Sequence, residues 1–205
     1  MKRIGIIGEN FKNDACAFKA LIAPQYNDQI ALIPIGPGLS GGDLPVKTII
    51  AEIARAIKKE RLEYVLIIRD LDNDEKRAKR YRWFENVKKG APIESLFYLA
   101  VMELEALILS DIDTFNRIYG IKGQYTKNPM FEKDPKRLLR DRTSQAKRQY
   151  HPNHALEIFS ELQFDVVYRK HKGEDSFQAF IDDFEEKFKL KPTTKERLKK
   201  GRGKG

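Results

Sequence analysis

The sequence predicts an α/β fold in which a parallel β-sheet has helices on both faces, followed by a helical second half. Two observations lead to this fold class. Apolar runs of strand length alternate with amphipathic helical segments over residues 1–110, the pattern of successive strand–helix–strand units. Residues 64–68 (Tyr-Val-Leu-Ile-Ile) form a continuous apolar run rich in β-branched side chains, which is typical of a strand buried on both faces of a parallel sheet.

The elements of the first half follow from these patterns. Strands are predicted over residues 3–8, 30–35, 64–68 and 94–102, and helices from about 13, over 44–60, from about 74 and through 104–108. Asn13 or Asp14 is expected to cap the first helix. The Gly-rich loop 36–43 is expected over the site or at its rim. Gly8 invites comparison with a dinucleotide-binding turn, but the G-x-G-x-x-G spacing is absent there, and the sequence contains no Walker-type phosphate loop.

The second half is predicted to be mainly helical and to pack on the α/β half without a full core of its own. Helices are expected over residues 113–119, from Asp134-Pro135, over 152–162 and over 175–188, with one edge strand over 164–168. The predicted organisation is an α/β core over 1–112, a helical elaboration over 113–188 and a basic tail over 189–205.

Composition excludes several classes of protein. No apolar run approaches the ~20 residues of a membrane span, and residues 1–3 lead into a strand and not into a signal peptide. Cys16 is the only cysteine, which excludes disulfides within the chain and cysteine-rich zinc sites. A cytoplasmic protein that does not engage a membrane is therefore expected.

The net charge of +9 is distributed unevenly. Residues 189–205 hold eight Lys/Arg and one Glu, and this tail either binds phosphates or is a solvated terminus. Residues 133–148 hold seven Lys/Arg and two Asp inside the predicted fold. From this second segment we predict nucleic-acid contacts by Lys136, Arg137, Arg140 and Arg148.

Acidic residues follow three of the predicted strands. Glu9 follows the first, Asp70 and Asp72 follow the third with Asp74 close behind, and Glu103 follows the fourth. In a parallel sheet these strand ends lie at one edge, where ligand chemistry collects. Carboxylates gathered there would repel one another, and oxygen ligands suit Mg²⁺ or Mn²⁺. The pattern therefore indicates a metal site.

Each of these acids also has a structural interpretation. Asp72 or Asp74 could cap the following helix, although Asp70 would remain unexplained. Glu103 and Glu105 could be first-turn helix acids. These two residues are about 200° apart on an ideal helix, so only one is expected to point inward, and Glu103 is favoured.

A glutamate after the first strand and Asp-x-Asp after the third resemble the Toprim domain. More narrowly, three segments are similar to a family of standalone Toprim-like proteins related to OLD (overcoming lysogenization defect) nucleases of prokaryotic defence modules. The segments are Ile-Gly-Ile-Ile-Gly-Glu-Asn-Phe-Lys-Asn-Asp (4–14), Ile-Arg-Asp-Leu-Asp (68–72) and Met-Glu-Leu-Glu-Ala-Leu-Ile-Leu-Ser-Asp (102–111). The resemblance implies a Toprim-like, Rossmann-like fold.

The resemblance also implies a function, namely a Mg²⁺- or Mn²⁺-dependent nuclease acting on DNA or RNA as the effector of an antiviral defence module. Glu9, Asp70 and Asp72 would hold the first ion, and Asp74 and Glu103 are candidates for a second. Lys147 or Arg148 would stabilise charge that develops at the phosphate. Because no ATPase motif is present, an ATPase partner would be a separate chain. No topoisomerase tyrosine domain or primase zinc module accompanies these motifs.

Two other functional hypotheses remain open at this point. The same acidic cleft could hold one structural Mg²⁺ in a non-catalytic module that docks on an ATPase or on nucleic acid. A receiver-like phosphoacceptor is disfavoured because only Glu9 stands where an acidic pair is expected. His151 and His154 make a poor zinc site, since a proline lies between them. Assembly into a homo-oligomer stays open.

Overall fold

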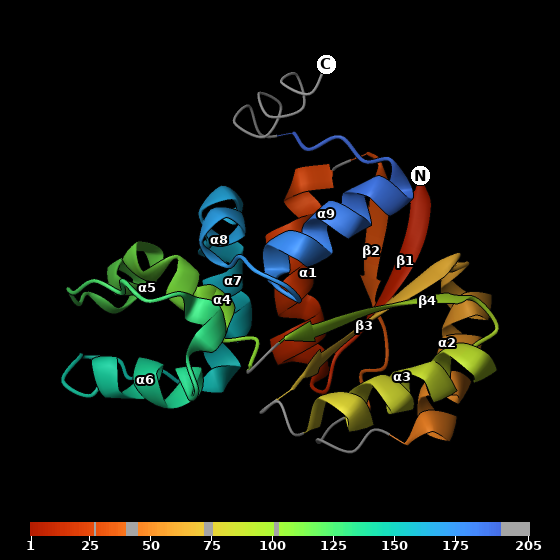
Figure 1. The fold of residues 1–205 in the computed structure, drawn as a ribbon, viewed down its shortest axis with the longest axis horizontal. Coiled ribbons are helices and arrows are strands. Elements are labelled where there is room, and N and C mark those ends of the chain that lie inside the picture. The colour runs from red at the N-terminus through yellow and green to blue at the C-terminus, as the bar shows by residue number, and fades with distance from the viewer. Residues whose placement is uncertain (27, 40–44, 72–75, 101–102, 194–205) are drawn as a thin grey trace.

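A four-stranded parallel sheet forms the centre of the fold (Figure 1). The computed structural model describes residues 1–26, 28–39, 45–71, 76–100 and 103–193. The strands are β1 (Lys2–Ile7), β2 (Ile30–Pro34), β3 (Tyr64–Asp70) and β4 (Glu94–Ala100), in the order β2-β1-β3-β4. All three strand pairs are parallel, which confirms the predicted α/β class.

Helices cover both faces of the sheet. The helices α1 (Ala17–Ile22) and α9 (Phe177–Phe188) lie on one face, and α2 (Val46–Glu60) and α3 (Arg77–Gly90) lie on the other. Side chains of β3 alternate between the two cores: Leu66 and Ile68 pack toward α1 and α9, whereas Val65 and Ile67 pack toward α2. Burial on both sides explains why the strand is apolar at every position from Tyr64 to Ile68.

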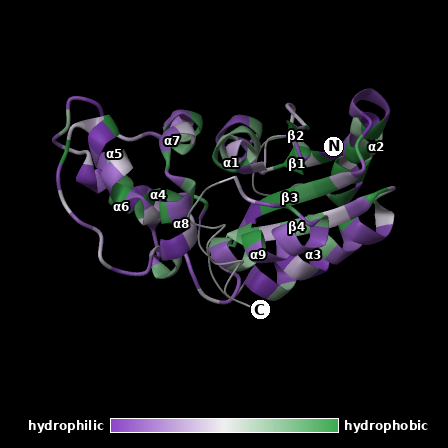
Figure 2. Ribbon diagram, turned by 90° about the horizontal axis from the view of Figure 1, so that it is seen from above, coloured by the Kyte–Doolittle hydropathy of each residue, from purple (hydrophilic) through white to green (hydrophobic). Residues whose placement is uncertain are grey.

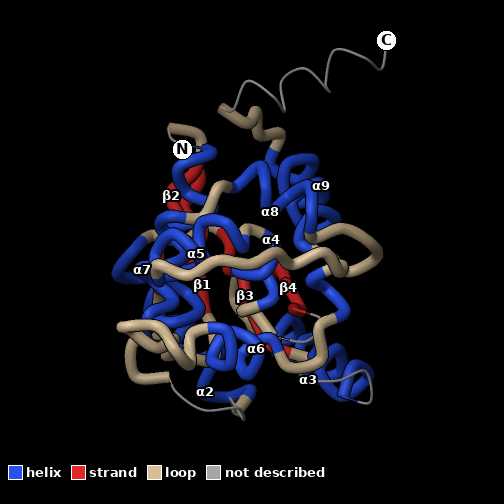
Figure 3. Tube along the Cα trace, turned by 90° about the vertical axis from the view of Figure 1, so that its left-hand side faces the viewer, coloured by secondary structure: helices blue, strands red, loops and turns tan. Residues whose placement is uncertain are grey.

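The second half forms a helical lobe beside the α1 face of the sheet (Figures 2 and 3). Its helices are α4 (Ala106–Ser110), α5 (Ile112–Tyr119), α6 (Pro135–Arg142), α7 (Ala155–Glu161) and α8 (Phe164–Lys170). Short 3₁₀ turns occur at Ala23–Tyr26, Pro129–Phe131 and Pro152–His154. Phe115 and Phe159 of the lobe belong to the same apolar core as Ile6 and Phe18. The lobe and the sheet therefore share one core.

The predicted edge strand over 164–168 is wrong, because these residues form helix α8. The buried side chains are Phe164, Val167 and Tyr168, whose spacing of three and four residues is helical and not alternating. The β-branched pair at 166–167 suggested a strand, but the helix buries only one member of that pair.

The predicted cap of the first helix is also wrong. The helical segment begins with a π-helical turn, Phe11–Cys16, and its cap is Asn10, whose side chain accepts hydrogen bonds from the N–H groups of Lys12 and Asn13. Asp14 accepts from the Asn10 N–H at 2.6 Å instead. The other predicted helices are present, although the predicted helix starts near 44 and 74 and the strand end at 101–102 lie outside the described residues.

Among the described residues, no helix combines the length and the apolar content that crossing a bilayer requires.

A buried histidine makes stability depend on pH. His171 is 2% exposed, and its Nδ1 accepts a hydrogen bond of 3.0 Å from the Phe177 N–H. Burial lowers the pKa of His171 from 6.5 to about 4. The unfolded chain therefore binds this proton more readily than the folded chain, so stability falls as the pH drops from 6.5 toward 4.

We expect the free energy of unfolding to decrease between pH 7 and pH 5 by up to about 2 kcal/mol through His171. His171→Asn keeps an acceptor for the Phe177 N–H but removes the titration, so its pH dependence should be flatter by that amount. Urea unfolding at pH 7, 6 and 5 measures both curves. Parallel curves for the two proteins would contradict this role of His171.

Candidate functional site at the carboxyl edge of the sheet

The parallel sheet brings the predicted acids to one edge. The pairings of β1 with β3 and of β3 with β4 place Glu9, Asp70 and Glu103 beyond the carboxyl ends of three neighbouring strands. Gly8 is required for the turn after β1, because a Cβ there would lie 2.4 Å from the Cβ of Asp14. The close approach of Gly8 and Asp14 turns the chain at Glu9 toward the neighbouring strand ends.

The Lys136 ammonium lies among three carboxylates. Its Nζ is 3.4 Å from Asp70 Oδ2, 3.0 Å from Glu103 Oε1 and 3.4 Å from Glu105 Oε2. Helix α6, which begins after its cap Asp134, positions this lysine in its first turn, and the Lys136 N–H also donates to Glu103 at 3.2 Å. The basic segment 133–148 therefore borders the acidic cluster, as predicted.

Both glutamates after β4 reach Lys136, so the expectation that only one would point inward is wrong. Residues 103–105 precede α4, and backbone hydrogen bonds from Ala106 to Glu103 and from Ile108 to Glu105 span three residues. This tighter 3₁₀-like turn differs from the ideal α-helix on which the expectation rested. Glu105 is the more buried of the two and also accepts a hydrogen bond from Tyr150 Oη at 3.2 Å.

Glu9 is held by two buried arginines. Arg69 is 2% exposed, and its Nε donates to Glu9 Oε1 at 2.8 Å. Arg80 of α3 lies 3.6 Å from the same oxygen. The Arg69 guanidinium stacks on the Trp83 ring, 4.4 Å from its centroid. This stacking fixes the guanidinium and hence the position of the Glu9 carboxylate.

Burial and mutual repulsion raise the pKa values of the central acids. Desolvation, followed by the neighbouring Glu105 carboxylate, raises the pKa of Asp70 well above its usual range. Burial likewise raises the pKa of Glu105, and it raises that of Asp14 to about 6. Burial alone would lower the pKa of Lys136, but the surrounding carboxylates outweigh burial and raise it.

The described cluster contains more negative than positive groups. Its carboxylates are Glu9, Asp14, Asp70, Glu103 and Glu105, and its cationic side chains are Lys136, Arg69 and Arg80. With every group ionised, five carboxylates face three cations, an excess of two negative charges. Burial is the largest cause of the raised carboxyl pKa values, and repulsion between the carboxylates adds to it.

Other predicted site residues lie apart from this cluster. Arg148 forms a two-pronged ion pair with Glu157, with both distances 2.6 Å. Lys147 is exposed and makes no hydrogen bond or ion pair with a described residue. The cation that contacts the acids is Lys136 of α6, and a role of Lys147 or Arg148 at a bound phosphate stays a prediction. Asp72 and Asp74 lie outside the described residues.

The remaining basic residues of α6 face solvent. Arg140 is exposed, and Arg137 is exposed with its Nε 3.7 Å from its own helix cap, Asp134. Lys136 differs from them, because its partners are carboxylates within the fold. Its contact with nucleic acid stays a prediction, to which the structure adds a position among the carboxylates.

His151 and His154 stabilise a turn. The His151 side chain accepts from the Asn153 N–H, while His154 Nδ1 accepts from the His151 N–H. His154 Nδ1 also lies 2.8 Å from Tyr119 Oη. These contacts cap the turn Pro152–His154, which is a structural role.

The described residues contain no group of three or more His, Cys, Asp or Glu side chains arranged to hold a metal ion. The chemistry of the cluster nevertheless fits a hard divalent cation, because its donors are carboxylate oxygens, the ligands that Mg²⁺ and Mn²⁺ prefer. The ammonium of Lys136 lies where three of those carboxylates converge.

Several participants were not predicted from the sequence. Glu105 was a candidate, but Glu103 was favoured over it, and Asp14 was expected to cap a helix. Arg69, Arg80 and Tyr150 were not singled out. Arg69 carries one usable signal, since an arginine within an otherwise apolar buried strand needs an anionic partner. Tyr150 carries none, because its contact with Glu105 depends on how the second half folds back.

No family model, no curated protein and no solved structure matches the chain.

Lys136→Met tests the role of the central cation. The change keeps the aliphatic length but leaves Asp70, Glu103 and Glu105 without their shared counter-ion, so we expect the free energy of unfolding to fall by about 2 kcal/mol in EDTA. Millimolar Mg²⁺ should restore part of this loss by supplying positive charge. Arg137→Met is the matched control, and at its exposed position we expect a change within about 0.5 kcal/mol.

Denaturant unfolding with EDTA and with Mg²⁺ provides both measurements. Equal effects of Lys136→Met and Arg137→Met would contradict the structural role of Lys136. A loss that Mg²⁺ does not reduce would argue against a cation site among these carboxylates.

Proposed function

We propose that the chain is a Mg²⁺- or Mn²⁺-dependent phosphodiesterase that acts on nucleic acid. The observation that carries this proposal is the convergence of carboxylates from three strand ends at the carboxyl edge of a parallel sheet. Gathering partly buried carboxylates is costly unless a cation compensates them. The resemblance of residues 4–14, 68–72 and 102–111 to the Toprim-like family points the same way.

Asp70, Glu9 and Glu103 would hold the ion, with Asp72 and Asp74 as further ligands in the segment that follows β3. When bound, the ion would activate a water molecule and stabilise the leaving oxygen of a phosphodiester. Asp70 is oriented for this task by the Leu104 N–H, which donates to its Oδ1 at 2.9 Å. Glu9 is oriented by Arg69.

Lys136 would have two roles in this proposal. Without substrate, its ammonium balances the negative charge of the carboxylates that it contacts. With substrate bound it would lie next to the phosphate and stabilise negative charge that develops there. Arg137 and Arg140, on the exposed surface of the same helix, would neutralise adjacent phosphates of the strand.

A second candidate function is a non-catalytic module that binds one Mg²⁺ and docks on a partner. The observation that favours it is that Lys136 already contacts three of the carboxylates, so the cluster can form without a metal. In both versions the proposed partners are nucleic acid and a separate ATPase chain, and the proposed setting is an antiviral defence module. The ATPase partner and the defence setting rest on the family resemblance.

Asp70→Asn tests catalysis. Asparagine keeps an acceptor for the Leu104 N–H but removes the charge that holds a divalent cation, so we expect cleavage to be abolished and Mg²⁺ affinity to fall at least about ten-fold. Stability in EDTA should hold or rise, because repulsion from Glu105 is relieved. The assay uses plasmid, single-stranded DNA and tRNA with Mg²⁺, Mn²⁺ or EDTA, and calorimetry measures metal affinity.

Asp141→Asn is the matched control, since it removes one carboxylate from the exposed surface of α6. It should retain both cleavage and Mg²⁺ affinity. Full cleavage by Asp70→Asn would refute the catalytic proposal. Mg²⁺ binding that requires Asp70 without cleavage of any of the three substrates would favour the non-catalytic module.

The basic surface beside the cluster gives a separate prediction. Replacing Arg137, Arg140 and Lys147 together by Ala should weaken nucleic-acid binding and reduce the slope of log K against log salt by about 2 to 3 for a duplex. These three side chains are exposed, so the free energy of unfolding should change little. Fluorescence anisotropy over 50–300 mM salt measures the slope (about 0.9 per phosphate contact). An unchanged slope would exclude this surface as the docking face.

A further inference from the structure

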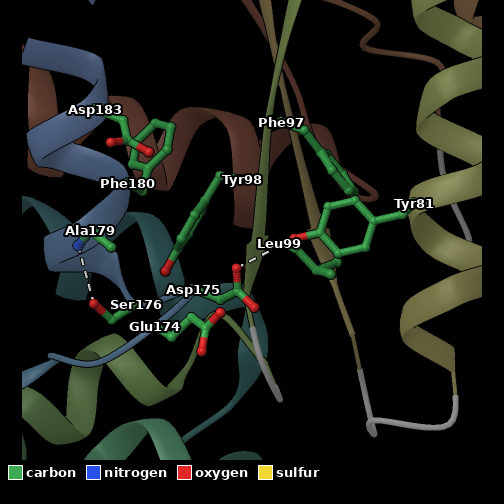
Figure 4. A pocket seen from close by; sticks show the side chains of 10 residues that line it. All are labelled: Tyr81, Phe97, Tyr98, Leu99, Glu174, Asp175, Ser176, Ala179, Phe180 and Asp183. Atoms are coloured by element: carbon green, nitrogen blue, oxygen red, sulfur yellow. Dashed lines mark hydrogen bonds between the residues drawn. The ribbon is translucent and has the colours of Figure 1, made fainter. Parts of the chain in front are cut away.

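A groove runs along the outer edge of β4, between α3 and α9, and Figure 4 shows one of its pockets. The groove consists of two adjoining pockets of about 350 Å³ and 310 Å³ that share Phe97, Phe180 and Asp183. Residues of β4 line both pockets, from Glu94 at one end to Leu99 at the other. The groove therefore follows nearly the whole strand.

The floor of the groove carries backbone groups that can pair with another strand. The Ala100 carbonyl accepts from the Leu71 N–H, so Ala100 directs its polar groups toward β3. Because alternate residues of a strand point their N–H and C=O groups to opposite sides, those of Ser95, Phe97 and Leu99 point away from β3. Within the described part of the chain these outward groups have no hydrogen-bond partner. An extended peptide can add to such an edge.

The two walls of the groove differ in chemistry. On the side of α3 the wall is aromatic, because the rings of Tyr81 and Phe97 pack edge to face with their centroids 5.8 Å apart. On the side of α9 the wall carries the exposed carboxylates of Glu174 and Asp183. Figure 4 shows Tyr81 and Phe97 on one side of β4 and Asp183 on the other. An occupant of the groove therefore meets apolar rings on one side and acids on the other.

The unpaired charge of the groove is negative. Among the described residues, neither Glu174 nor Asp183 has a hydrogen-bond or ion-pair partner for its carboxylate. The other ionised side chains that line the two pockets have partners: Asp175 pairs with Arg77, Glu94 with Lys187 and Lys88 with Glu85. Electrostatic complementarity therefore favours an occupant that brings positive charge to the acidic wall.

A buried hydroxyl gives a second indication of a ligand. Tyr98 lines the larger pocket and is 2% exposed, and its Oη has no hydrogen-bond partner within the described chain. A buried polar group without a partner costs about 1–3 kcal/mol. The Phe180 ring lies beside Tyr98, with the two centroids 4.8 Å apart. A cationic N–H donor in this pocket would supply a hydrogen bond and would lie against aromatic rings.

We infer that the groove binds an extended segment of a partner protein in which apolar and basic residues alternate. The backbone of the segment would pair with the outward groups of β4. Successive side chains of a strand point to opposite faces, so they would meet the two walls in turn. Apolar side chains would pack on Tyr81 and Phe97, and Lys or Arg side chains would face Glu174 and Asp183.

Other occupants use fewer of these features. A nucleic acid would bring its phosphates against the unpaired carboxylates. A free amine would use the acidic wall but would leave the outward backbone groups of β4 unpaired. A second copy of the chain would have to bring its own sheet edge between α3 and α9, which both line the groove, and its flanking helices would meet them first.

A synthetic pentapeptide, acetyl-Val-Arg-Val-Arg-Val-amide, tests the inference. Extended, it spans about 17 Å, which matches five residues of β4. At saturating peptide, the amides of Ser95, Phe97 and Leu99 should exchange hydrogen about ten-fold more slowly. The amides of Leu96, Tyr98 and Ala100 point toward β3 and should be unchanged, which provides an internal control. Exchange is followed by nuclear magnetic resonance on the whole chain.

Matched peptides separate the contributions of charge and backbone. The neutral peptide acetyl-Val-Gln-Val-Gln-Val-amide should bind at least about ten-fold more weakly. Two further peptides carry a methyl group on the nitrogen of the central Val or of the next Arg. Because alternate N–H groups of a strand face β4, one of these two should lose at least ten-fold in affinity and the other much less. Arginine amide, which has the cation without the strand, should not protect the outward amides.

Variants of the acidic wall complete the test. Glu174→Gln with Asp183→Asn should weaken binding of the Val-Arg peptide about three- to ten-fold. Glu186→Gln is the matched control, because it removes one charge from α9 outside the groove. It should change the affinity less than two-fold. All three side chains are exposed, so the variants should remain folded.

Four results would overturn the inference. The first is the absence of any protection of the outward amides at millimolar Val-Arg peptide. The second is equal binding of the neutral peptide, or binding that does not depend on Glu174 and Asp183. The third is binding that neither backbone methylation reduces, because the groove would then take only a cationic side chain. The fourth is protection that rises with protein concentration and molecular mass without peptide, because the occupant would then be a second copy.

Discussion

Parallel strands place all their carboxyl ends at one edge of the sheet, and in this chain those ends are acidic. Glu9, Asp70 and Glu103 follow three neighbouring strands and share a small, partly buried volume. Carboxylates at such distances repel one another strongly where water is excluded. The fold must therefore supply positive charge at this edge, and Lys136 from the second half contacts Asp70, Glu103 and Glu105.

This requirement explains why the helical lobe is part of the site. Lys136 reaches the acids from the first turn of α6, and Tyr150 bonds Glu105 from the segment after that helix. Glu9, in contrast, is held by Arg69 and Arg80 from within the α/β half. Among the described contacts the acids thus have two sets of supports. The contacts of Asp70, Glu103 and Glu105 with Lys136 depend on the packing of the lobe against the sheet.

The sequence predicted the sheet well, because the strands of a parallel sheet covered on both faces contain continuous apolar runs. The runs at 3–8 and 64–68 needed no tertiary information. Helix α8 was missed since two adjacent valines have a high β propensity, whereas the buried side chains follow the helical period of Phe164 and Val167. The acids at the strand ends were predicted to lie together because parallel strands place their carboxyl ends at one edge of the sheet. Lys136 was recognised as basic, but its partner set depends on contacts 31 to 66 residues away in sequence.

The charges of the cluster also bear on how a divalent cation would enter. The described carboxylates outnumber the described cations, so a divalent ion would add positive charge to the cluster without requiring Lys136 to leave. A lysine side chain has four rotatable carbon–carbon bonds, so its ammonium can move aside while its backbone stays fixed by the Glu103 carboxylate. A displaced ammonium would remain within reach of an anion bound at the same edge. Lys136 can therefore balance the negative charge of the carboxylates when no metal ion is bound and also stabilise a bound phosphate. Both roles require that α6 stays packed on the sheet.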